Sequence, residues 1–175
     1  MEGLTVALQG LGHVGYDYAR RLHEAGAKLM VADIDEAALE RARAEFGAEV
    51  VSVDAIYDVD ADIYAPCALV ATLNPNTLSR LRAKIVAGGA NNQLATADIG
   101  DLLRQKKVLY APDFVLNAGG IIKVCYEYLK KPEADVEAHV REISSTLAEI
   151  FARADREGRS TAVVADELAR SRFQT

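Results

Sequence analysis

The sequence predicts an α/β fold, with a doubly wound parallel sheet followed by a helical extension. Short apolar runs alternate with amphipathic helical patterns up to residue 117, and closely spaced glycines follow the first run. Alternating units of this size are typical of parallel strands connected by helices, and right-handed crossovers place those helices on both faces of the sheet. We therefore expect one domain of 175 residues, with a core over 1–117 and a helical extension over 118–175.

The expected strands are short apolar runs bounded by glycine, proline or polar residues. They cover residues 4–9, 28–32, 50–53, 62–65, 84–88 and 108–111. The fourth strand is expected to break at Pro66, because proline lacks a backbone N–H for the sheet. Helices are expected between these strands at 13–25, 35–45, 74–82 and 97–106. Gly26 ends the first helix, Asp35 caps the second, and Gly47 suits the left-handed turn that ends it.

The extension is expected to contain helices at 118–131, 133–157 and 162–172, separated by Pro132 and Gly158. The middle helix has apolar residues at steps of three and four, which predicts one buried face along its length. These residues are Val136, Val140, Ile143, Leu147, Phe151 and Ala154.

Composition narrows the possible partners. The formal net charge is −6 and the pI about 5.1, which argues against nucleic acid and anionic membranes, since phosphate binding needs a basic surface. Apolar runs are too short for a membrane span, and the N-terminus lacks the pattern of a signal peptide. Cys67 and Cys125 lack metal-ligand spacing, so we expect no metal site and reduced thiols in a cytoplasmic protein, with a disulfide between them left open.

Glycines at positions 10, 12 and 15 follow the first strand and open the first helix, with the spacing of the Rossmann dinucleotide-binding motif. Gly10 allows a tight turn, Gly12 lets backbone amides approach a pyrophosphate, and Gly15 lets the helix pack on the sheet. Asp33 ends the second strand, where a carboxylate accepts hydrogen bonds from ribose hydroxyls and repels the 2′-phosphate of NADP. The pattern therefore predicts NAD binding. The alternatives are a glycine-bearing turn and an aspartate that only turns the chain.

Other residues beside this motif are candidate cofactor contacts. His13 is next to the phosphate position, although a solvated histidine is the favoured alternative; Val14 and Ile34 complete this group. Asn92 follows the fifth strand and Asn117 the sixth, at the carboxyl edge where ligands bind in such sheets. The alternatives are an asparagine-rich turn for the first and a helix N-cap for the second. Residues 66–69 are expected to form a turn after the fourth strand, and Cys67 in this turn is favoured as a small apolar contact over a nucleophile.

Five segments in order resemble the leucine, valine and phenylalanine dehydrogenases of the glutamate dehydrogenase superfamily, over nearly the whole chain. They are residues 9–15 (QGLGHVG), Asp33, residues 65–68 (APCA), residues 90–94 (ANNQL) and residues 110–120 (YAPDFVLNAGG). The resemblance implies oxidative deamination of an L-amino acid to its 2-oxo acid and ammonia, with hydride passing to NAD. It also implies that Asn92 contacts the nicotinamide ribose, Asn117 the nicotinamide and substrate, and Cys67 and Ala68 the adenosine or ribose.

The same resemblance assigns Asn117, Ile121 and Val124 to the substrate pocket. Ile121 and Val124 share a helix face, and Val124 favours an aliphatic or aromatic substrate because a carboxylate beside it would lack a partner. Their alternative is ordinary core packing. Lys123 is expected to be exposed or near a phosphate, rather than catalytic.

The family's catalytic lysines and aspartate belong to a preceding N-terminal domain, and the seven lysines here include no glycine-rich lysine loop. The motif begins at residue 10, so we expect that domain to be absent, leaving a chain that binds NAD without turnover and meets an amino acid only together with the missing domain. We also expect the extension helices to expose apolar surface that the missing domain covers. The rival hypotheses are an NAD-sensing subunit that regulates a partner, such as a full-length dehydrogenase, and a methyltransferase.

Overall fold

A computed structural model describes residues 1–68 and 71–173, which form a six-stranded sheet in the order β3-β2-β1-β4-β5-β6. All neighbouring strands are parallel. The strands are β1 (Thr5–Gln9), β2 (Lys28–Ala32), β3 (Glu49–Val50), β4 (Ile63–Pro66), β5 (Ile85–Val86) and β6 (Leu109–Tyr110). This order, in which the chain reverses direction across the sheet after β3, is the doubly wound arrangement, so the predicted fold class is confirmed.

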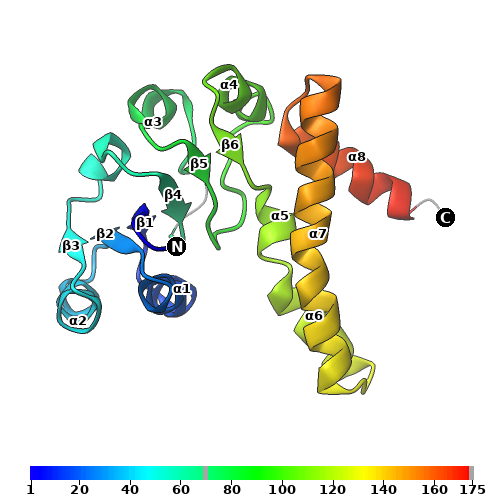
Figure 1. Cartoon of the computed structure of the whole chain (residues 1–175), viewed down its shortest axis with the longest axis horizontal. Coiled ribbons are helices and arrows are strands. Elements are labelled where there is room, and N and C mark those ends of the chain that lie inside the picture. Colours follow the sequence, from blue (N-terminus) through cyan, green and yellow to red (C-terminus); the bar gives the residue numbers. More distant parts are fainter. Residues whose placement is uncertain (69–70, 174–175) are drawn as a thin grey trace.

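Helices cover both faces of the sheet (Figure 1). The first pair is α1 (His13–Glu24) and α2 (Glu36–Phe46), and the opposite face carries α3 (Pro75–Arg80), α4 (Ile99–Gln105) and the 3₁₀ helix η1 (Ala55–Asp58). Side chains alternate along β1, so that Val6 and Leu8 pack with α1 and α2 while Ala7 packs with the other layer. Both layers are therefore buried against one continuous sheet.

The third, fourth and fifth expected strands differ from the structure, and the fifth, expected at 84–88, contains only Ile85 and Val86. The third was expected at 50–53, but only Glu49 and Val50 pair with β2, and the chain then turns at Ser52, whose Oγ accepts the Ala55 N–H at 3.1 Å. Pro66 was expected to break the fourth strand, but it is the last residue of β4. The ladder tolerates proline there because the next amide, that of Cys67, donates to the Gln9 carbonyl at 2.7 Å.

The extension contains α5 (Asp113–Leu116), α6 (Gly119–Tyr128), α7 (Glu133–Glu157) and α8 (Thr161–Phe173). Helix α7 has the predicted bounds, but its apolar face is buried only near its C-terminal end, where Ile150 and Ala154 pack against α8. Val140 is 36% exposed, because the hairpin of α6 and α7 extends away from the sheet (Figure 1). The prediction of one buried face along the whole helix is therefore wrong for the N-terminal half of α7. No helix among the described residues has an apolar stretch that would reach across a membrane.

Candidate functional site

The glycine loop between β1 and α1 is closely packed at two of its three glycines. Gly10 has a φ of +100°, and a Cβ there would lie 2.7 Å from the Ala68 backbone nitrogen. A Cβ on Gly15 would lie 1.9 Å from the Gly10 carbonyl oxygen. Around Gly12, by contrast, a Cβ would meet no described atom within 4 Å. The outer side of Gly12 therefore leaves room for a ligand to approach the backbone.

Helix α1 begins at this loop with free amide groups. Gly12 is its N-cap, and among the described residues no side chain caps it and no acidic residue lies in its first turn. Helix α2 differs, because the Asp35 carboxylate accepts the Ala37 N–H at 3.0 Å, as predicted. Uncapped amides and the helix dipole favour an anion at the start of α1. His13 and Val14 are both exposed there.

A hollow of about 450 Å³ lies beside the same loop, between α1 and α2. Gly12 and His13 line it together with Arg41, whose guanidinium stacks over the Tyr16 ring at 4.3 Å from the centroid. Arg41 adds positive charge near the uncapped amides, which suits phosphate groups. Sequence reasoning missed it, because its distance from the loop depends on how α2 packs on α1.

Asp33 connects the end of β2 to the glycine loop. Its carboxylate accepts the Leu11 N–H through Oδ2 and the Asp35 N–H, at 2.9 Å, through Oδ1. Each oxygen keeps a further lone pair that ribose hydroxyls could use. Ile34 beside it is 91% exposed, so an apolar side chain is available next to the acid.

The turn after β4 is packed between the glycine loop and the loop that follows β5. The Cys67 sulfur accepts the Gly89 N–H at 3.4 Å, and Ala68 is exposed beside Gly10. Burial raises the pKa of the Cys67 thiol, while the Gly89 N–H opposes this shift less strongly. A neutral thiol supports the packing interpretation over a nucleophile. Leu69, the last residue of this predicted turn, lies outside the described residues.

Both Cys67 and Cys125 are free in the part of the chain that the structure describes. Across residues 1–68 and 71–173, no group of three or more His, Cys, Asp or Glu side chains is placed to hold a metal ion.

Asparagines from two strand ends meet at the carboxyl edge of the sheet. Asn117 Nδ2 donates to Asn91 Oδ1 at 2.6 Å, while Asn92 is exposed and has a left-handed φ of 51°. The alternative role of Asn117 as a helix N-cap is wrong: Ala118 is the N-cap of α6, and the Asn117 amide points instead to the loop after β5. Sequence reasoning missed Asn91 as its partner.

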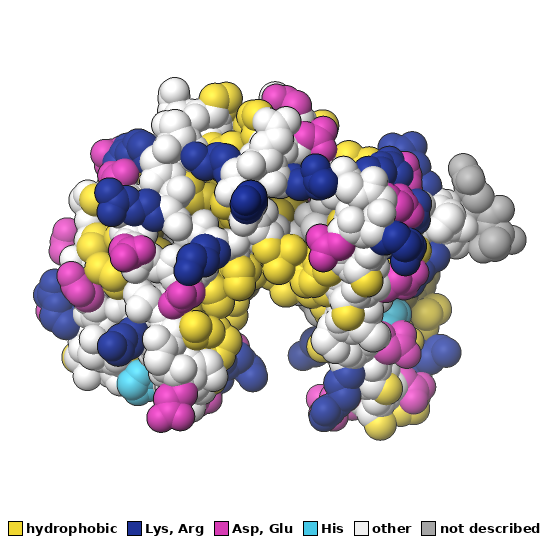
Figure 2. Space-filling model, turned by 45° about the horizontal axis from the view of Figure 1, so that its top comes forward, with side chains coloured by type: hydrophobic (Ala, Val, Ile, Leu, Met, Phe, Trp, Pro, Cys, Tyr) yellow, Lys and Arg dark blue, Asp and Glu magenta, His cyan; other side chains and the backbone are white. Residues whose placement is uncertain are grey.

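Ile121 and Val124 lie on α6 and are 68% and 60% exposed, whereas Ile122 between them is buried. The core-packing alternative is therefore wrong for this pair. Figure 2 shows a hollow between the α1–α2 side of the molecule and the α6–α7 hairpin, with hydrophobic side chains gathered at its closed end. Lys123 is exposed and its Nζ lies 3.9 Å from Glu127 Oε1, so it forms a surface ion pair.

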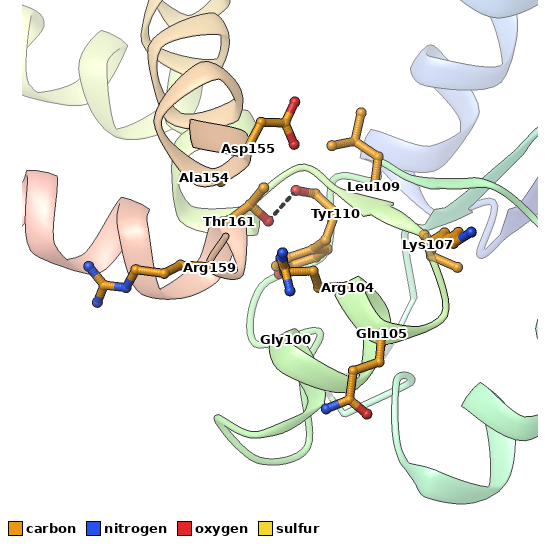
Figure 3. Close-up of a pocket in the computed structure, with 11 residues that line it drawn as sticks. Gly100, Arg104, Gln105, Lys107, Leu109, Tyr110, Ala154, Asp155, Arg159 and Thr161 are labelled. Atoms are coloured by element: carbon orange, nitrogen blue, oxygen red, sulfur yellow. Dashed lines mark hydrogen bonds between the residues drawn. The ribbon is translucent and has the colours of Figure 1, made fainter. Parts of the chain in front are cut away.

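A separate hollow of about 500 Å³ lies beside β6, between α4 and the junction of α7 and α8 (Figure 3). Lys107, at its rim, precedes β6, whereas the candidate site residues follow the carboxyl ends of the strands. In Figure 3 the side chains of Lys107, Gln105 and Arg159 point away from one another, and Arg159 is held by Glu167 at 2.9 Å. Because these three side chains point away from one another, they do not converge on a position where they could bind one ligand together.

The sheet order, the glycine loop and Asp33 define the class of the protein: it is a nucleotide-cofactor-binding domain of the Rossmann type. Residues 30–169 match the family model described as Glutamate/Leucine/Phenylalanine/Valine dehydrogenase, and the chain belongs to this family.

Individual relatives agree with this assignment. The chain is 45% identical to the leucine dehydrogenase of Thermoactinomyces intermedius over 174 residues, which are 99% of this chain and 48% of that protein. It is 44% identical to an L-tryptophan dehydrogenase of Nostoc punctiforme, over 99% of this chain and 49% of that protein. The chain thus spans about half the length of the curated relatives it matches.

Solved structures show the same fold. A crystal structure of the L-tryptophan dehydrogenase from Nostoc punctiforme matches with a TM-score of 0.95 and 42% identity, over 99% of this chain and 52% of that one. A hetero-hexameric glutamate dehydrogenase from Thermus thermophilus matches with a TM-score of 0.70 and 19% identity, over 99% of this chain and 48% of that one, which shows likeness of fold alone.

Proposed function

We propose that this chain is the NAD-binding domain of an amino acid dehydrogenase that oxidatively deaminates a hydrophobic L-amino acid to its 2-oxo acid and ammonia. The observation that carries the proposal is the Asp33 carboxylate held against the glycine loop, beside the uncapped start of α1. Residues Gly10, Gly12, His13, Val14 and Gly15 surround the pyrophosphate in this proposal. Asp33 and Ile34 bind the adenosine half, and the carboxylate favours NAD over NADP because it repels a 2′-phosphate.

The nicotinamide half is proposed to lie at the ends of β4, β5 and β6. Asn92 and Asn117 provide amide groups there, and Cys67 and Ala68 form the turn along the ribose. When bound, the cofactor accepts the hydride, and the residues of this domain bind and orient it. The open space beside Gly12 and the uncapped start of α1 support the fit of the cofactor's pyrophosphate to this domain.

The substrate is proposed to be hydrophobic because Ile121 and Val124 present apolar side chains from α6. A substrate whose side chain ends in a carboxylate would place that charge beside these residues without a partner, which is costly. Relatives named leucine dehydrogenase and L-tryptophan dehydrogenase support this class without separating its members.

The chain by itself is proposed to bind NAD without turnover, because the resemblance places the proton-transfer lysines and aspartate in a different domain. Calorimetric titration with NAD, followed by an assay for leucine- or valine-dependent NADH formation, tests both halves. We expect binding and no NADH. Absence of binding at millimolar NAD contradicts the cofactor assignment, and NADH formation by the pure chain contradicts the second half.

A second candidate function is an NAD-binding subunit that regulates a dehydrogenase. The observation that favours it is the exposed apolar face of α6, which includes Tyr128 beside the two pocket residues and is followed by exposed Leu129. Mixing the pure chain with a full-length leucine dehydrogenase distinguishes the two. An NAD-dependent change in that enzyme's activity favours the regulatory function, and no change favours the first proposal.

A further inference from the structure

The loop after β5 is held to the start of α5 by a hydrogen bond between residues distant in sequence. The Asp113 carboxylate accepts the Gln93 backbone N–H at 2.8 Å through Oδ2 and the Phe114 N–H at 2.7 Å through Oδ1. A carboxylate that accepts two backbone amides forms strong, directional bonds. Asp113 therefore fixes the position of the loop after β5 relative to the start of α5.

The Gln93 side chain fixes the loop from inside. It is fully buried, and its Nε2 donates to the Gly88 carbonyl at 2.7 Å and to the Ala90 carbonyl at 2.9 Å. A buried N–H group is expensive to leave unbonded, so these two bonds from Gln93 Nε2 hold residues 88–93 in one shape.

Asn92 lies between these two anchors. Its carbonyl accepts the Ala71 N–H at 2.7 Å, and the amide that follows it donates to Asp113. Its backbone is thus held on both sides in the left-handed region, which costs an asparagine free energy and persists only where the surroundings enforce it. Its side chain is exposed and forms no hydrogen bond within residues 1–68 and 71–173. The Asn92 side-chain amide is therefore available to a ligand, and the backbone that carries it is held in a fixed position.

Asn117 is held to the same loop through Asn91 Oδ1 at 2.6 Å. We propose that Asp113 and Gln93 are positioning residues, which fix the Asn92 amide, and through this loop the Asn117 amide, for the nicotinamide half of the cofactor. The inference rests on the proposed function and adds the residues that would act through the two asparagines.

The test compares NADH with ADP, which lacks both the nicotinamide ring and its ribose, on the whole chain. Asp113→Asn keeps the size of the side chain but replaces one acceptor oxygen with a donor. We expect it to weaken NADH binding about tenfold, as loss of one charged hydrogen bond predicts, while ADP binding changes less than twofold. Asn92→Ala is expected to give the same selective loss. Asp101→Asn, on the exposed first turn of α4, is the matched control and is expected to change neither affinity.

Fluorescence of bound NADH gives a second readout that a general loss of stability would not mimic. We expect the emission of NADH bound to the Asp113→Asn variant to shift towards that of free NADH, because the ring is held less firmly. Equal losses for NADH and ADP, or no loss for either, overturn the positioning role without contradicting the proposed function. Failure of the wild-type chain to bind NADH overturns the proposed function, and this inference with it.

Discussion

The Asp33 carboxylate accepts the backbone N–H of Leu11, a residue 22 positions earlier in the sequence. The bond joins the end of β2 to the glycine loop, so the same side chain shapes the loop and faces the proposed ribose position. Asparagine at this position keeps one acceptor oxygen, which can still bond the Leu11 N–H, while it loses the negative charge and the bond from the Asp35 N–H.

Asp33→Ala is expected to weaken NAD binding at least tenfold, because hydrogen bonds to a charged group contribute about 1.5–3 kcal/mol. Asp33→Asn is expected to lose less NAD affinity and to bind NADP more tightly than the wild type, since the repulsion of the 2′-phosphate is removed. Calorimetry with both cofactors measures these changes. Asp35→Asn, which keeps an N-cap on α2, is the control. Unchanged preference between NAD and NADP in Asp33→Asn would argue against the ribose contact.

Gly12 and Gly15 provide a matched pair of substitutions within one loop. Gly15→Ala places a Cβ within 1.9 Å of the Gly10 carbonyl oxygen, so it should destabilise the fold by about 1–3 kcal/mol, measured by chemical denaturation. Gly12→Ala meets no described atom within 4 Å and has a φ of −63°, so it should leave stability nearly unchanged and weaken NAD binding. If Gly12→Ala binds NAD like the wild type, the pyrophosphate does not approach this position.

Local pattern was enough to predict much of the fold. The bounds of α7 follow from its own periodicity and from Pro132 and Gly158, and β1 and β2 follow from apolar runs. The pattern of α7 shows which face is apolar, but it does not show that Val140 stays 36% exposed, because burial depends on other elements. β3 was overestimated for a similar reason: its length is set by pairing with β2 and by the Ser52 turn.

The candidate site was predictable to the extent that its residues act through local backbone. The roles of Gly10 and Gly15 could be predicted because only glycine fits where they pack, and their close contacts are found in the structure. The bond between Gln93 and Asp113 joins residues 20 apart that meet only once β5 and β6 are paired. Such a partner cannot be read from spacing, although both residues lie inside the segments that resemble the family.

Cys67 is expected to resist alkylation at neutral pH, because burial raises its thiol pKa and lowers the fraction of reactive thiolate. Mass spectrometry after iodoacetamide treatment should show Cys125, which is exposed, labelled well before Cys67. Raising the pH should increase labelling of Cys67, and saturating NAD should slow it. Faster labelling of Cys67 than of Cys125 at neutral pH would contradict the buried, neutral thiol.

Ion pairs of Glu167 join α8 to the C-terminal end of α7 and to the turn between the two helices. Glu167 pairs with Arg159 and, at 2.8 Å, with Arg153, and these guanidinium groups hold its pKa below the usual value. A carboxylate whose pKa is lowered on folding stabilises the fold above its unfolded pKa of about 4.3, and this contribution is lost as the pH falls through the folded value. Glu167→Gln should therefore lower the Tm at pH 7, and the difference from wild type should shrink below about pH 4. Asp166→Asn is the control, because Asp166 pairs with Arg170 inside α8. A Tm difference for Glu167→Gln that is the same at pH 7 and pH 3 would show that its charge does not join the two helices.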